Sequence, residues 1–170
     1  MEDRPGVLTR VVSLFRRRNF NIESISVGHT EVPDVSRMTL VVDGSNTIVE
    51  QVTKQLYKLI NIRKVSDVTA DPTVDRELAL IKVSAKPSNR TDIMQIVDIF
   101  RGKVVDVAPS SLVVEVTGPE NKIESFVALV RPYGIKEMVR TGKVSMVRGS
   151  IATRELVGAG SVNGNGKSAD

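Results

Sequence analysis

Apolar residues recur with helical spacing in four segments of the chain. They lie at intervals of three and four residues over 6–18, over 48–60 behind a polar start at 44–47, over 89–101 and over 120–133. Side chains with this spacing line one face of an α-helix and can pack on a core. The pattern therefore predicts four amphipathic helices.

Between these helices, apolar residues alternate with polar ones or form short continuous runs, as in β-strands. The second half of the chain has the order strand, helix, strand, strand, helix, strand, which is the split βαβ unit of ferredoxin-like folds. The sequence therefore predicts an α+β fold with two ferredoxin-like βαββαβ units. The predicted strands cover 21–29, 35–42 and 62–68 in the first half, and 77–86, 103–108, 111–117, a strand from 135 onward and a short one ending at 147 in the second.

The two halves align as an internal repeat. A shift of about 85 positions, the separation of Phe15 and Phe100, places the apolar positions of the first helix on those of the third. A shift of about 74, the separation of Val49 and Ile123, does the same for the second and fourth helices. The offsets differ because the first half has a longer hairpin connection, at 30–34. Agreement in position as well as in element order indicates a true repeat.

The repeat divides the chain into four parts. We expect a first domain over 1–70, a linker over 71–76, a second domain over 77–149 and a tail over 150–170. The tail is rich in Gly, Ser, Asn and Ala, a composition typical of disordered chain.

The first copy of the repeat lacks the strand that opens the second copy. Residues 77–86 map to positions at or before Met1, so we expect the first domain to lack most of its first strand and this chain to be a shortened form. That strand is central in a split βαβ sheet, and its loss would leave both neighbours with unpaired backbone groups. A second difference is that Gly6 aligns with Thr91, so only the first copy keeps a glycine turn.

The turn before the first predicted helix combines Asp3, Pro5 and Gly6. A helix N-terminus has unpaired N–H groups and a partial positive charge that favour a carboxylate, and glycine lets a ligand approach the backbone. Asp3 can accept hydrogen bonds from an ammonium group, Asn21 can donate and accept, and Ile22 suits a branched aliphatic side chain. The same residues also fit an ordinary strand-to-helix turn capped by Asp3, so the pattern leaves amino-acid binding and a structural turn open.

Composition narrows the range of functions. The chain has no Cys and one histidine, His29, so disulfides, thiolate chemistry and sites with several imidazole ligands are excluded. We therefore expect no metal site. A Ser-His-Asp triad could be built only through His29, which has no nucleophile motif nearby, so we interpret His29 as a strand or dimer-surface residue. No apolar run approaches twenty residues and no secretory leader is seen, so we expect a cytoplasmic protein that does not bind a membrane.

Positive charge forms a run at only one place, Arg16-Arg17-Arg18, because the 24 basic residues are otherwise interleaved with 20 acidic ones. The run can interact with the last carbonyls of the first helix, with an acidic partner protein or with a phosphate backbone. It and the connection at 30–34 are predicted to flank the same end of the first domain, and we expect them to contact a partner subunit there.

Several motifs, in their order and spacing over 2–149, closely resemble the regulatory (small) subunit of acetolactate synthase, also called acetohydroxyacid synthase. They include Glu2-Asp3-Arg4-Pro5-Gly6-Val7-Leu8, Phe20-Asn21-Ile22-Glu23-Ser24, Arg76-Glu77-Leu78-Ala79-Leu80-Ile81-Lys82-Val83 and Arg140-Thr141-Gly142.

The resemblance implies an N-terminal ACT domain, a ferredoxin-like C-terminal domain and no active site of the chain's own. It implies a partner, the large catalytic subunit, which carries thiamine diphosphate, Mg²⁺ and FAD. Members of the family raise the activity of that subunit and confer feedback inhibition of branched-chain amino acid synthesis by valine, or in some members by leucine or isoleucine. This chain itself is expected to bind no cofactor.

The resemblance also implies where the amino acid binds. In the family it lies between two ACT domains of a homodimer. Carried over by motif position, one subunit supplies Asp3 and Gly6 and its partner supplies Asn21 and Ile22. Some members have Asn at the position of Asp3, so selectivity or affinity can differ here.

Other interpretations stay open. Another ACT-domain amino-acid sensor would share the first domain. An RNA-binding ferredoxin-like module would need exposed aromatic residues on its central strands, and 111–117 offers aliphatic ones. An acylphosphatase-like hydrolase would need a loop-Arg and strand-Asn motif that does not match, and an ACT-bearing transcription regulator would need a helix-turn-helix, which is not visible. We therefore expect no nucleic-acid partner.

Overall fold

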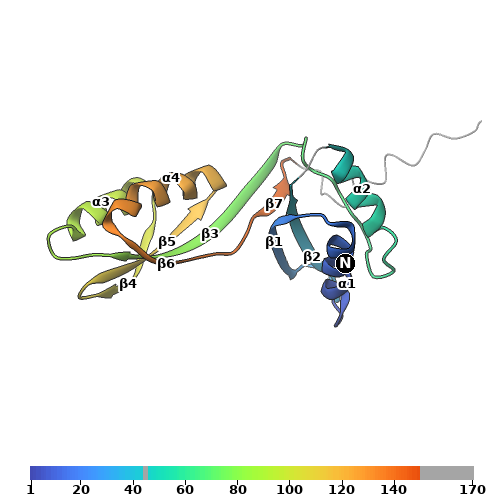
Figure 1. The fold of residues 1–170 in the computed structure, drawn as a ribbon, viewed down its shortest axis with the longest axis horizontal. Helices are drawn as coiled ribbons and strands as arrows, with labels where there is room; N and C mark the ends of the chain where they lie inside the picture. Colours follow the sequence, from blue (N-terminus) through green and yellow to red (C-terminus); the bar gives the residue numbers. More distant parts are fainter. Residues whose placement is uncertain (44–45, 150–170) are drawn as a thin grey trace, which may run out of the picture.

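The computed structural model describes residues 1–43 and 46–149 of the chain, and the tail predicted at 150–170 lies outside the described residues. The described part forms two α+β units joined by a long strand, as Figure 1 shows. Its elements are α1 (Val7–Arg18), β1 (Ile22–His29), β2 (Ser36–Val42), α2 (Asn46–Leu56), β3 (Thr73–Ser84), α3 (Arg90–Ile99), β4 (Lys103–Ala108), β5 (Ser111–Gly118), α4 (Glu120–Val130), the 3-10 helix η1 (Arg131–Tyr133), β6 (Ile135–Arg140) and β7 (Val144–Val147).

The C-terminal unit is built on an antiparallel sheet in which β4-β5-β3-β6 lie in this order, with α3 and α4 on one face (Figure 1). The fifth strand, β7, pairs with β3. Alternate side chains of β3 point toward the helices, and Ala79, Ile81 and Val83 are fully buried there. Phe100 and Phe126 meet edge to face with ring centres 5.5 Å apart. This order, with the first strand of the unit in the centre, confirms the predicted ferredoxin-like topology.

The N-terminal unit packs α1 and α2 on one face of the antiparallel pair β1-β2. Helix α1 forms because its apolar residues make one stripe, of which Val11, Leu14 and Phe15 are buried in the core with two residues of α2. It ends at Asn19, which adopts a left-handed conformation (φ 55°) and donates its N–H to the carbonyls of Phe15 and Arg16. The predicted helix and hairpin are therefore confirmed here.

The strand predicted at 62–68 is wrong, because these residues form no strand. In the repeat, such a strand pairs with the first strand of its unit; here residues 1–3 pair beside the start of β2. Met1 and Ser36 exchange backbone hydrogen bonds of 2.9 and 3.0 Å, and the N–H of Asp3 bonds the carbonyl of Asp34 at 2.9 Å. Beyond this short pairing, a cavity of about 450 Å³ lies between β2 and 62–69.

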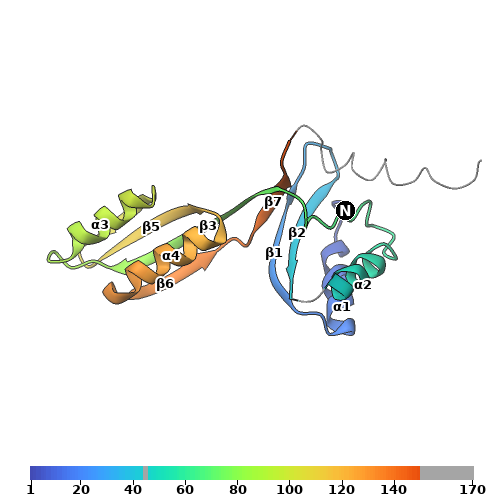
Figure 2. The same ribbon diagram turned by 90° about the horizontal axis from the view of Figure 1, so that it is seen from above.

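The segment predicted as a linker is partly strand, since β3 begins at Thr73. Its first four residues, 73–76, pair with β7 as a two-stranded ribbon. The ribbon lies on the face of β1-β2 opposite the helices, as both views show (Figure 1 and Figure 2). The connection between the two units is therefore ordered as a strand ribbon that lies on the N-terminal sheet.

Candidate functional site

The N-terminus of α1 is shaped by Gly6. This residue is exposed and adopts a left-handed conformation (φ 83°), and a Cβ placed there would meet no atom within 4 Å. Glycine is therefore required by the backbone conformation and leaves open space above the turn. No side chain caps the helix, so the capping role considered for Asp3 is wrong. The N–H of Val7, the first residue of α1, donates to the carbonyl of Arg4 at 3.3 Å, and no side chain caps the first turn.

The carboxylate of Asp3 lies beside this turn and contacts the last residue of β1. Its Oδ2 is 3.0 Å from Nδ1 of His29, and both side chains are exposed, His29 more so. The sequence suggested only a strand or surface position for His29 and missed this contact. No local sequence signal indicates it, because it depends on the hairpin register, which sets His29 opposite Ser36 and close to the paired segment 1–3.

Asn21 and Ile22 lie at the other end of α1. Asn21 is exposed just before β1, and Ile22 pairs with Val42 at the start of the hairpin and packs against the core. The 12-residue helix separates the two ends by about 18 Å. One chain therefore brings Asp3 and Gly6 together but does not bring them to Asn21 and Ile22, and no single small ligand can touch both pairs in one copy.

The arginine run is exposed in the last turn of α1, and the Arg18 Nη2 donates to Gln55 Oε1 at 3.3 Å. The prediction that 30–34 flanks the same end is wrong. Strand β1 starts near the C-terminus of α1 and runs back along it, so the connection at 30–34 lies at the N-terminus of α1, where Asp34 bonds Asp3. The run therefore lies at the Asn21 end of the domain.

One edge of the N-terminal unit is apolar and open. Ile25 and Val27 of β1 are 36% and 43% exposed, and Leu8 and Val12 of α1 are 42% and 44% exposed. Within the described ranges, β1 has no strand neighbour other than β2. Exposed apolar side chains along a free strand edge are typical of a surface that pairs with another chain.

Two protein-family models match the chain. The model described as "AHAS small subunit-like ACT domain" matches residues 1–64, and the model described as "Small subunit of acetolactate synthase" matches residues 76–149. The chain belongs to the acetolactate synthase small subunit family. It therefore has a regulatory role as one subunit of an enzyme whose catalytic subunit is a separate chain.

Individual relatives agree with this membership. A probable acetolactate synthase small subunit of Archaeoglobus fulgidus is 56% identical over 150 residues, which are 88% of this chain and 94% of the relative. The acetolactate synthase small subunit of Bacillus subtilis is 55% identical and covers 87% of each chain. The crystal structure of the small subunit from Thermotoga maritima superposes with a TM-score of 0.82 at 41% identity, over 88% of this chain and 94% of that one.

No group of three or more His, Asp or Glu side chains within 1–43 and 46–149 is placed to hold a metal ion. In the same ranges, no helix combines the length and the apolar character that crossing a membrane requires.

Proposed function

We propose that this chain activates the catalytic subunit of acetolactate synthase and makes it sensitive to feedback inhibition by a branched-chain amino acid, with valine as the preferred effector. The observation that carries the proposal is the uncapped N-terminus of α1 at Gly6 with the carboxylate of Asp3 beside it. The effector carboxylate binds N–H groups in the first turn of α1, and its ammonium group binds Asp3. Thiamine diphosphate, Mg²⁺ and FAD belong to the catalytic partner.

The proposed site is completed by a second copy of the chain. Two copies related by a two-fold axis, with their α1 helices antiparallel, place Asp3 and Gly6 of one copy near Asn21 and Ile22 of the other. The exposed apolar edge of α1 and β1 supports such a pairing, because it would become buried. The side chain of Ile22 then forms the apolar wall that selects an aliphatic effector.

Inhibition requires the effector to favour one contact with the catalytic subunit over another. A coupling of about 1–3 kcal/mol is enough for a several-fold to hundredfold change in response. The exposed run Arg16-Arg17-Arg18 lies next to Asn21, and we assign it to the contact with an acidic surface of the catalytic subunit. Effector binding at Asn21 would then alter the position of this run.

Calorimetric titration of valine, leucine and isoleucine into the purified chain tests the proposal. Valine should bind most tightly, and Gly6→Asp should abolish binding because its carboxylate would occupy the effector's position. Gly149→Asp is the matched control, since Gly149 also has a positive φ (96°) and open space around it. It should bind valine as the wild type does. No heat with any of the three amino acids would refute the sensing role.

A further inference from the structure

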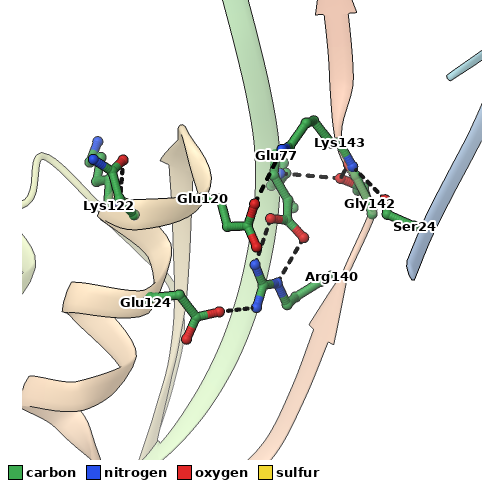
Figure 3. Close-up of polar contacts among 11 residues, drawn as sticks. Ser24, Glu77, Glu120, Lys122, Glu124, Arg140, Gly142 and Lys143 are labelled. Carbon is green, nitrogen blue, oxygen red and sulfur yellow. Dashed lines mark hydrogen bonds and ion pairs between the residues drawn. The ribbon is translucent and has the colours of Figure 1, made fainter. Parts of the chain in front are cut away.

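The C-terminal unit contacts the N-terminal sheet at the turn between β6 and β7 (Figure 3). The backbone N–H of Lys143 donates to Oγ of Ser24 in β1 at 3.0 Å. Gly142 has φ +81°, and a Cβ there would lie 2.7 Å from Ser24 Oγ and 3.1 Å from the carbonyl oxygen of Ile25. The turn and β1 approach each other so closely here that only glycine fits at position 142.

On the C-terminal side, this turn is fixed by charged hydrogen bonds. Arg140 donates through Nε and Nη2 to the two carboxylate oxygens of Glu77, both at 2.7 Å, and its Nη1 bonds Glu124 of α4. The Glu77 side chain is 8% exposed, and the bonds from Arg140 hold the pKa of its carboxyl below the ordinary value. Lys143 Nζ lies 3.2 Å from Glu120 Oε2 at the start of α4. The turn is thus attached to both the sheet and the helix layer.

The backbone ties the turn to β3 as well. The N–H of Thr141 donates to the carbonyl of Leu78 at 3.1 Å, and Oγ1 of Thr141 accepts from the N–H of Leu78 at 3.2 Å. A displacement of the turn would therefore displace β3, the central strand of the C-terminal sheet. The bidentate pairing makes this attachment resistant to bending, since an Arg–carboxylate fork fixes orientation as well as distance.

On the N-terminal side, the contact lies next to the candidate effector residues. Ser24 lies in β1 two residues after Ile22, with Asn21 just before the strand, and the pairing of β1 with β2 shifts register between Ile22 and Ser24. A register shift of this kind bends the strand locally, and the regular pairing of β1 with β2 continues beyond it. If Asn21 and Ile22 move toward a bound effector, the displacement therefore reaches Ser24 before it reaches the rest of β1.

We propose that the Ser24–Gly142 contact is the joint that transmits effector occupancy at Asn21 and Ile22 to the C-terminal unit. This inference rests on the proposed function, because it assumes that an amino acid binds at the N-terminal unit. Ser24 and Gly142 are positioning residues: they contact no effector, and they determine whether β1 and β3 move together. If the contact has this role, a substitution there weakens inhibition by valine without weakening valine binding. If the contact is only structural, the same substitution lowers the stability of the chain and nothing else.

The experiment uses the holoenzyme reconstituted from this chain and its catalytic subunit, with valine as the probe. Gly142→Ala inserts a methyl group into the joint, and Gly149→Ala is the control because it adds a methyl group at another positive φ with no atom within 4 Å. We expect Gly142→Ala to raise the valine concentration for half-inhibition by about tenfold or more, within the usual range of allosteric coupling. Its calorimetric Kd for valine should stay within about threefold of wild type, on that same coupling scale. Gly149→Ala should change neither quantity.

Ser24→Ala provides a second variant that adds no atoms, in case Gly142→Ala fails to fold. It removes only the acceptor for the Lys143 N–H, so we expect a smaller rise in the half-inhibiting concentration at an unchanged Kd. Wild-type inhibition in both variants would overturn the inference, as would a Kd that rises in parallel with the half-inhibiting concentration. Absence of valine binding to the wild-type chain would instead refute the proposed function, so the two failures are distinguishable before any variant is made.

Discussion

The carboxylate of Asp3 lies 3.0 Å from Nδ1 of His29, so the last residue of β1 contacts the side chain that we assign to the effector's ammonium group. The contact joins residues 26 positions apart across the helix and the first strand. It places the candidate ammonium site at the closed end of the hairpin β1-β2, and not at the start of β1 where Asn21 lies.

Replacing Asp3 with Ala should weaken valine binding strongly. The variant removes a charge-assisted hydrogen bond, for which about 1.5–3 kcal/mol is typical, so we expect a loss of tenfold or more in affinity. Asp3→Asn keeps an acceptor without the charge and should lose less. Asp71→Ala, at an exposed acidic residue away from the site, is the charge-matched control for calorimetry. Equal affinities for Asp3→Ala and Asp71→Ala would remove Asp3 from the site.

Removing His29 should have the opposite effect. In the wild type the imidazole occupies one oxygen of Asp3, and the effector's ammonium group must share or displace it. We therefore expect His29→Ala to bind valine about two- to tenfold more tightly, the equivalent of one hydrogen bond of roughly 0.5–1.5 kcal/mol. Calorimetry at pH 8 measures this directly. Weaker binding in His29→Ala would show that the histidine orients Asp3 for the effector instead of competing for it.

Charge reversal in the arginine run tests the contact with the catalytic subunit. Arg16→Glu combined with Arg17→Glu should reduce activation of the catalytic subunit, because an acidic docking surface would then be repelled. Valine binding to the isolated chain should be retained. Arg131→Glu, at an exposed arginine of the C-terminal unit, is the control. Full activation by the doubly reversed variant would exclude the run from the interface.

Acid should weaken the fold through Glu77. Its carboxyl has a pKa lowered from the ordinary value of 4.5, chiefly by hydrogen bonds from Arg140. A lowered folded pKa means that this carboxyl stabilises the fold above pH 4.5 and that the stabilisation is lost as the pH falls below it. Glu77→Gln should therefore cost roughly 1–3 kcal/mol of unfolding free energy at pH 7. In urea titrations the deficit should shrink as the pH falls toward 3.

Asp106→Asn is the control for this pH series, because Asp106 is exposed on β4, which two strands separate from β6, the strand of Arg140. It should leave the unfolding free energy unchanged at both ends of the pH range. If Glu77→Gln behaved in the same way, the pair with Arg140 would contribute nothing measurable to the fold.

The sequence predicted most elements because each carries its own periodicity. The stripe of Val11, Leu14 and Phe15 is sufficient to place α1, and the repeat is sufficient to place the C-terminal unit. The strand predicted at 62–68 failed because a strand needs a neighbour, and periodicity does not reveal whether that neighbour is present. The sequence predicts a linker at 73–76 because the pairing partner of these residues, β7, lies about 70 residues further along the chain.

The candidate site shows the same limit. Gly6 could be identified from local turn chemistry, and its positive φ agrees with that interpretation. The contact between Asp3 and His29 could not, because it depends on the register of a hairpin that brings distant positions together. The expectation that 30–34 lies beside Arg16 failed for a related reason, since sequence does not show along which direction β1 returns past α1.

The most direct test of a site shared between two copies is complementation in mixed dimers. Gly6→Asp and Asn21→Ala each destroy one half of the site, so neither variant alone should bind valine. In a mixed dimer one site carries both substitutions and the other carries neither. We predict that purified mixed dimers bind about one valine per dimer with wild-type affinity, as two-fold symmetry requires. Mixed dimers that bind no valine would contradict the account.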